Sequence, residues 1–162
     1  DKGVEMLSKV ERMHCYDLAQ SKATSKGMQF LKNYANVHSL AVDAKQASNG
    51  GLEAVKNGLA FFQELYMYGP EINDEFMAKH KGTLEGLQEL NLIGTVGTDA
   101  GLKELQDVKS LTAVRIAAGN ISPQAVEAFR KALPNVTVMV AGESGWTFTK
   151  PWGGAVDVTT MP

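Results

Sequence analysis

A repeat of 24 or 25 residues runs through almost the whole chain and limits the folds that the chain can adopt. Each copy carries two apolar residues separated by one position, as in Leu40 and Val42. The same pair recurs at Tyr16 and Leu18, Leu65 and Met67, Leu90 and Leu92, Val114 and Ile116, and Val138 and Val140. Six copies of one unit therefore fill residues 1 to about 141. Repeats of this length predict a solenoid.

The clearest copy shows what one unit is made of. Leu90 and Leu92 alternate with polar neighbours, which predicts a short strand with both leucines facing inward. A turn follows, and then Leu102, Leu105 and Val108 recur at helical spacing. Each unit therefore reads as strand, turn, helix and return.

A second column marks the helix starts. Its members are residue types that cap helix N-termini with a side-chain oxygen: Thr24, Ser48, Asn73, Thr98 and Ser122. Ser122 is the best of these signals because Pro123 follows it at the first helical position. A helical bundle with accidental spacing is the alternative. Five capping residues in register favour the repeat.

The motifs of these repeats resemble those of the leucine-rich repeat family. The pattern is L-x-x-L-x-L from Leu87, followed by G-T-x-x-T-D-x-G-L-x-x-L from Gly94, and ALPNVTV ends the array at 132–138. It looks like the bacterial and ribonuclease-inhibitor-like branch of that family. The resemblance implies an α/β fold, a right-handed solenoid over residues 1–141 with a parallel sheet on the concave face and helices on the convex face. It also implies binding more often than catalysis.

The sequence departs from the commoner family pattern at one column. The Asn or Cys expected three positions after the last strand leucine is replaced by Ser21, Lys45, Pro70, Thr95 and Gly119. The usual asparagine ladder is therefore missing. The inner turns must satisfy their backbone polar groups in another way.

The strand positions between the inward leucines are expected to face a partner. Across the middle of the sheet these candidate partner-binding residues are Asp43, Glu64, Tyr66, Tyr68, Glu89, Asn91, Ile93 and Arg115. Tyr and Arg dominate binding hot spots, so the first functional hypothesis is a non-enzymatic protein-binding module. The structural alternative is that these side chains pack on their cross-strand neighbours and bind nothing.

The two ends of the array suggest a second hypothesis, a structural subunit that self-assembles head to tail. The first unit shows no polar cap, and its candidate assembly residues are Val4, Leu7 and Val10. Residues 142–162 form an aromatic tail with candidate assembly residues Trp146, Phe148 and Trp152. The tail is open to three interpretations: a C-terminal cap, a segment that docks on another subunit, or a linker.

Catalytic and metal-binding signals are weak. His14 and His38 occupy equivalent places in adjacent repeats beside Cys15, but no carboxylate follows at a matching spacing. The glycines at 94 and 97 precede no G-K-[ST] sequence and read as turn glycines. We therefore expect no enzyme activity, no catalytic residue, no cofactor and no metal.

The net charge and the lengths of the apolar runs restrict the classes of partner that we expect for this chain. The formal net charge of −2 argues against nucleic acid or an anionic membrane, and no apolar run is long enough to span a bilayer. The expected partner is a protein or another copy of the chain. The chain starts at Asp1 without a Met, which we read as a processed form or a fragment, with an extracellular or periplasmic location favoured.

Overall fold

The computed structural model of the chain describes residues 1–10, 13–32, 37–58, 63–117, 120–141, 148–149 and 155–156. Within this part of the chain, six strands form one parallel sheet in sequence order. Their bounds are β1 Cys15–Asp17, β2 Ser39–Asp43, β3 Glu64–Tyr68, β4 Glu89–Ile93, β5 Ala113–Ala117 and β6 Thr137–Val140. The fold is therefore of the α/β class, as the sequence predicts.

The strand register follows the sequence repeat. Leu40 on β2 lies beside Leu65 on β3, which lies beside Leu90 on β4. Val114 on β5 and Val138 on β6 continue the same row. Since a one-residue slip would turn every side chain to the other face, this register confirms the alignment of the repeats.

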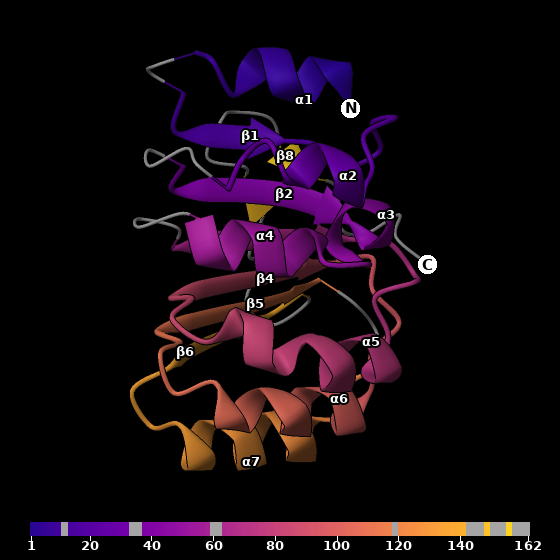
Figure 1. The fold of residues 1–162 in the computed structure, drawn as a ribbon. Helices are drawn as coiled ribbons and strands as arrows, with labels where there is room; N and C mark the ends of the chain where they lie inside the picture. Colours follow the sequence, from indigo (N-terminus) through magenta and orange to yellow (C-terminus); the bar gives the residue numbers. More distant parts are fainter. Residues whose placement is uncertain are drawn as a thin grey trace.

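Helices connect the strands and stack in the same order along one side of the sheet (Figure 1). Their bounds are α1 Lys2–Leu7, α2 Ser25–Met28, α3 Ala44–Ala47, α4 Gly51–Gly58, α5 Asp74–His80, α6 Asp99–Glu104 and α7 Pro123–Ala132. Short 3₁₀ helices extend two of them: η1 Lys81–Leu84 after α5 and η2 Leu105–Asp107 after α6.

The hydrophobic core lies between the helices and the sheet. The inward strand residues Leu65, Met67 and Leu90 are fully buried, and helix residues such as Met28 and Phe129 pack in the same cluster. Apolar burial of this kind contributes roughly 25 cal/mol per Å² of apolar area. The inward face of the sheet is thus the one that the leucine column predicts.

Four of the five predicted N-caps form as expected. Thr24, Asn73, Thr98 and Ser122 each accept a backbone N–H at the start of a helix. Ser48 was expected to do the same and does not. It ends the additional helix α3 instead, and its own N–H donates to the carbonyl of Ala44.

Helix α3 arises from a local signal at the end of β2. The Asp43 side chain caps the helix, and the Gln46 side chain accepts the backbone N–H of Asp43. Together the two bonds complete a capping box. The Gln46 amide also donates to the carbonyl of Ala23 at 3.0 Å, so this side chain joins two neighbouring units. This insertion displaces the helix start that Ser48 was expected to cap.

Aspartates link the starts of successive helices. Each accepts both the backbone N–H and the side-chain hydroxyl of the N-cap residue in the next unit. These Asp–cap links join Asp1 to Thr24, Asp74 to Thr98 and Asp99 to Ser122.

Backbone hydrogen bonds join the turns that follow β3 and β4 to the neighbouring strands. The N–H of Gly69 donates to the carbonyl of Ile93 at 3.1 Å, and the N–H of Gly94 donates to the carbonyl of Ala117 at 3.0 Å. Both glycines have positive φ, a backbone conformation that residues with a Cβ rarely adopt. The inter-strand ladder therefore continues one residue beyond the strands.

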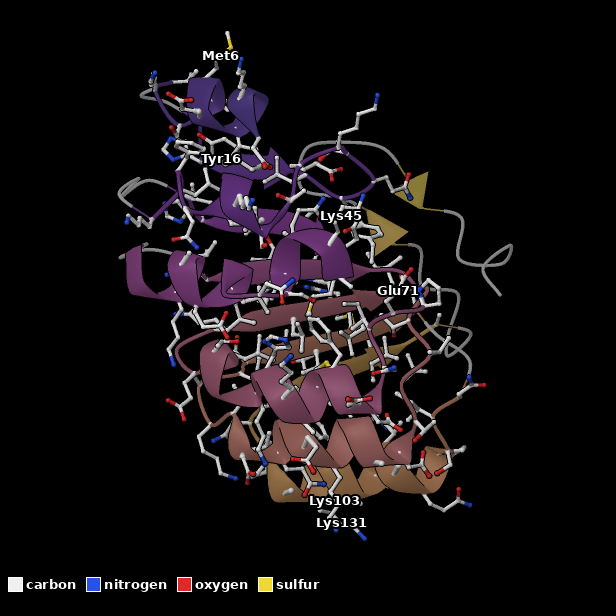
Figure 2. All side chains as sticks on the ribbon, turned by 45° about the vertical axis from the view of Figure 1, so that its right-hand side comes forward. Met6, Tyr16, Lys45, Glu71, Lys103 and Lys131 are labelled. Atoms are coloured by element: carbon white, nitrogen blue, oxygen red, sulfur yellow. The ribbon has the colours of Figure 1, made fainter. Side chains whose placement is uncertain are left out.

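A small antiparallel hairpin stands apart from the main sheet. It consists of β7 Phe148–Thr149 and β8 Ala155–Val156. In Figure 1 the hairpin lies behind the sheet while the helices lie in front of it, and the turned view of Figure 2 shows it on the right with the helices to the left. The hairpin therefore lies on the side of the sheet away from the helices.

Candidate functional site

The sheet face away from the helices carries three rows of side chains, and we call it the helix-free face. The register and the alternation of side chains define the rows. The first row is Cys15, Ser39, Glu64, Glu89, Ala113 and Thr137; the second is Asp17, Ala41, Tyr66, Asn91, Arg115 and Met139; the third is Asp43, Tyr68, Ile93 and Ala117. All of the predicted partner-binding residues belong to these rows.

Glu64 is the centre of one polar cluster on this face. Its carboxylate accepts hydrogen bonds from the Ser39 hydroxyl on β2 and from the Tyr66 hydroxyl on β3. Burial raises the pKa of Tyr66 well above its ordinary value, and the bond to the Glu64 carboxylate raises it further. Tyr66 therefore stays protonated and acts as a hydrogen-bond donor.

Cys15 borders the Glu64 cluster from β1. Burial raises the pKa of its thiol, the negative charge of Glu64 raises it further, and a hydrogen bond with Ser39 opposes both effects. A thiol with a raised pKa is a poor nucleophile at neutral pH. The surroundings of Cys15 therefore give no support to nucleophilic chemistry.

Arg115 is the centre of a second polar cluster. Its Nη1 donates to Glu89 Oε2 at 2.6 Å and to Asn91 Oδ1 at 3.2 Å. The Asn91 amide in turn donates to the carbonyl of Leu65 at 3.4 Å. The side chains of Arg115 and Glu89 keep 24% and 36% of their surface exposed, so the pair is held in position and still reaches solvent.

The structure corrects the expectation that all the predicted partner-binding residues are open to a partner. Tyr66, Tyr68, Asn91 and Ile93 are buried. Asp43 is partly exposed, but its carboxylate caps α3 and accepts the backbone N–H of Gln20 at 3.1 Å. The accessible members of the set are Glu64, Glu89 and Arg115, which are half-buried.

The predicted assembly residues do not lie together at a bare edge. Val4 is buried in the core and packs beside Gly27 of α2, which corrects the expectation that it is free. Leu7 is half-buried against the core, whereas Val10 is 44% exposed. Trp146, Trp152 and the side chain of Phe148 lie outside the described residues.

A cavity of about 880 Å³ lies at the carboxyl ends of β1, β2, β3 and β4. Its lining includes Asp43, Lys45, Tyr68 and Glu71, and Figure 2 labels Lys45 and Glu71 on the same side of the molecule. The sequence pattern did not predict this cavity. Its walls come from the loops of four successive units. Only the parallel strand order showed that the strand ends of these units meet at one edge.

The described part of the chain holds no group of three or more His, Cys, Asp or Glu side chains placed to bind a metal ion. The rings of His14 and His38 do meet edge to face, with centroids 5.6 Å apart, and both histidines are exposed. In the same described ranges, no helix is long and apolar enough to cross a membrane.

Comparison with known proteins adds no family assignment. No model of a protein family matches the chain, and no curated protein matches it.

Proposed function

We propose that the chain is a non-enzymatic protein-binding module with the architecture of a leucine-rich repeat solenoid. In this proposal the sheet forms the concave surface and the helices form the convex one. The support is the strand order, in which six parallel strands follow one another at the period of the sequence repeat. Arrays of this kind offer an extended surface built from equivalent positions of successive units.

The arrangement around Arg115 carries the proposal. Of the guanidinium nitrogens of Arg115, only Nη1 has hydrogen-bond partners among the described residues. These partners are Glu89 and Asn91. The other guanidinium N–H groups have no hydrogen-bond partner among the described residues, and 24% of the Arg115 side chain is exposed. A guanidinium whose orientation is already fixed loses less side-chain entropy on binding, which favours such a residue as a binding anchor.

A structural subunit that self-assembles head to tail remains the second candidate. The observation in its favour is the apolar surface at the α1 end, where Met6 is 70% exposed and Val10 is 44% exposed. Figure 2 places Met6 at the extreme end of the molecule. Light scattering over a range of concentrations tests this candidate, and a monomer at every concentration would rule it out.

The binding proposal is tested with peptides selected from a displayed library against the immobilised full chain. A selected peptide is then titrated against the wild type and against Arg115→Ala. Loss of a central anchor weakens binding by about tenfold or more, which corresponds to ~1.4 kcal/mol. Lys103→Ala is the matched control, because this exposed cation lies on α6, on the helix side of the sheet.

Two results decide the binding proposal. Weaker binding by Arg115→Ala with unchanged binding by Lys103→Ala supports the helix-free face as the binding surface. Equal affinity for both variants shows that the peptide binds elsewhere, and the assignment of this face fails. Far-UV circular dichroism of both variants confirms that the fold is retained.

A further inference from the structure

The cavity at the carboxyl ends of β1–β4 has an apolar inner wall and a charged rim. Tyr68 and Ile93, which are buried, line it from the ends of β3 and β4. Lys45 and Glu71, which are exposed, line it from helix α3 and from the loop after β3. Its volume of about 880 Å³ lies within the range of pockets that hold small molecules, roughly 300–1,000 Å³. Size and lining therefore both suit a small organic ligand.

The turns around the cavity include two residues with a backbone conformation that is uncommon for side chains with a Cβ. Gln20 and Asn49 have φ of 59° and 51°, and within the described ranges they are the non-glycine residues with positive φ. Asparagine adopts this conformation more readily than glutamine does. The N–H of Gln20 donates to Asp43 Oδ2 at 3.1 Å, which holds the turn in place. Costly backbone of this kind gathers at ligand sites, and here it lies in the cavity wall.

Lys45 and Glu71 carry opposite charges at this cavity and do not neutralise each other. Among the described residues, neither of them forms an ion pair. Lys45 Nζ donates to a neutral acceptor, the carbonyl of Ser21, at 3.2 Å. Glu71 Oε2 lies 3.0 Å from the position that a Cβ on Gly69 would take, so the carboxylate lies over this glycine of the cavity wall. Figure 2 labels Lys45 and Glu71 on the same side of the molecule.

The other carboxylate of the lining is already occupied. Asp43 Oδ1 accepts the N–H of Lys45 at 2.8 Å, and Oδ2 accepts the N–H of Gln20. The same side chain belongs to the capping box of α3. The Glu71 carboxylate, by contrast, accepts no hydrogen bond from the described residues. Glu71 is therefore the acid of this lining, and Lys45 the base, that can bind a charged ligand.

We infer that this cavity binds a small zwitterion, a molecule with one ammonium and one carboxylate group, which is the chemistry of free amino acids and short peptides. Glu71 binds the ammonium group and Lys45 binds the carboxylate group. Hydrogen bonds between charged groups fix the orientation of a ligand. The apolar part of the ligand lies against Tyr68 and Ile93 and adds affinity by burial. Arg115, the anchor of the proposed protein-binding surface, is not part of this lining, so the inference does not rest on the proposed function.

Nuclear magnetic resonance of the isotope-labelled full chain tests this site. The probes are free phenylalanine and the dipeptide alanylphenylalanine. We expect them to shift the amide signals of Gly69 and Gly94 in the cavity wall and to leave that of Lys131 on α7 unchanged. Shifts with one probe alone identify the amino acid or the peptide as the better fit. No shift with either probe at millimolar concentration overturns the inference, and so do shifts that are confined to residues outside the lining.

Blocked forms of the probe that binds separate the two charged contacts. N-acetylation removes the ammonium group and amidation removes the carboxylate group, and each change should weaken binding by about threefold to tenfold. Glu71→Gln should abolish the effect of acetylation and keep that of amidation. Lys45→Gln should do the reverse. A variant that weakens all forms of the probe alike would show a structural role and overturn the contact assigned to that residue.

The matched controls change the same charges outside the cavity. Glu75→Gln and Lys103→Gln are suitable because both residues are exposed and neither lines the cavity. Both variants should keep the two effects of blocking. Equal changes in the control variants would assign binding to general electrostatics and overturn the inference. Arg115→Ala should bind the probe as the wild type does, so the cavity and the protein-binding surface are tested separately.

Discussion

Asp74 on α5 fixes the position of Thr98, the N-cap of α6. One carboxylate oxygen accepts the Thr98 backbone N–H at 2.7 Å and the other accepts its hydroxyl at 2.6 Å. The first oxygen also accepts the N–H of Gly101 at 2.9 Å. Burial alone would raise the pKa of Asp74, but these bonds outweigh it and lower the pKa.

Asp74→Ala is expected to destabilise the fold by about 1–2 kcal/mol, because the N-terminal donors of α6 lose a charged acceptor. Urea unfolding measures the change. The contribution of Asp74 is present at neutral pH, since its folded pKa is lowered, and it is lost as pH falls through that folded pKa. The difference between variant and wild type should therefore shrink in acid.

The control for Asp74 is its neighbour Glu75, an exposed acid in the first turn of the same helix. Glu75→Ala should change stability by less than about 0.5 kcal/mol. Equal losses from both substitutions would point to general charge effects at the helix start and contradict the specific link to Thr98.

Gly101→Ala is expected to destabilise the protein although alanine favours helices by about 1 kcal/mol over glycine. A Cβ at this position would lie 2.5 Å from Asp74 Oδ1 and 3.4 Å from its Cα. The added methyl group would push Asp74 away from the helix start that it binds. Thermal denaturation of the variant measures the effect.

Gly3→Ala is the matched control in the equivalent column of the first unit. A Cβ there would meet no atom within 4 Å, and Gly3 lies in helix α1. This substitution should stabilise the protein by up to about 1 kcal/mol. A gain in stability at both glycines would show that close approach at Gly101 is unimportant.

The stability of the fold should fall as pH drops below about 6.5 because of His80. His80 is buried, its ring lies 4.4 Å from Phe76, and Nδ1 lies 3.6 Å from Glu53 Oε1. Burial lowers its pKa, Glu53 opposes this shift and Lys79 adds to it. Between the folded and unfolded pKa values the unfolded chain binds more protons, so acid favours unfolding.

His80→Leu should flatten the pH dependence of the urea midpoint between about pH 5 and 7.5. A wild-type slope that survives in His80→Leu would assign the pH dependence to other groups.

Arg130→Ala should promote association through the edge strand β6. Arg130 Nη2 donates to the carbonyl of Val138 at 3.1 Å, and its Nη1 binds Glu127 at 2.7 Å. Loss of this side chain frees an acceptor on an outer strand, which favours pairing with another chain. Light scattering should show a mass that rises with concentration, whereas Lys131→Ala, an exposed neighbour, should behave as wild type.

The strands and their register were predictable because both depend on a local pattern repeated at one period. Leu40, Leu65 and Leu90 are neighbours in the sheet because they occupy the same place in successive units. The N-caps at Thr98 and Ser122 followed from residue type and position alone. The prediction that Ser48 caps a helix was wrong, because the capping box of Asp43 and Gln46 starts an earlier helix.

The burial of the helix-free face was not predictable from the repeat. The alternation of side chains correctly assigned Tyr66 and Ile93 to that face, but it says nothing of what covers them. The Asp–cap links left a signal that could have been found: Asp1, Asp74 and Asp99 share one column of the repeat. Their partners became evident only when neighbouring helix starts were placed side by side.

The Asp–cap links have a direction along the chain. In each one the acceptor lies upstream, 23 residues before Thr24 and Ser122 and 24 residues before Thr98. A chain made from its N-terminus presents every acceptor before the matching donors exist. Each new helix start can therefore attach to a unit that is already complete, so the order of synthesis and the order of assembly coincide.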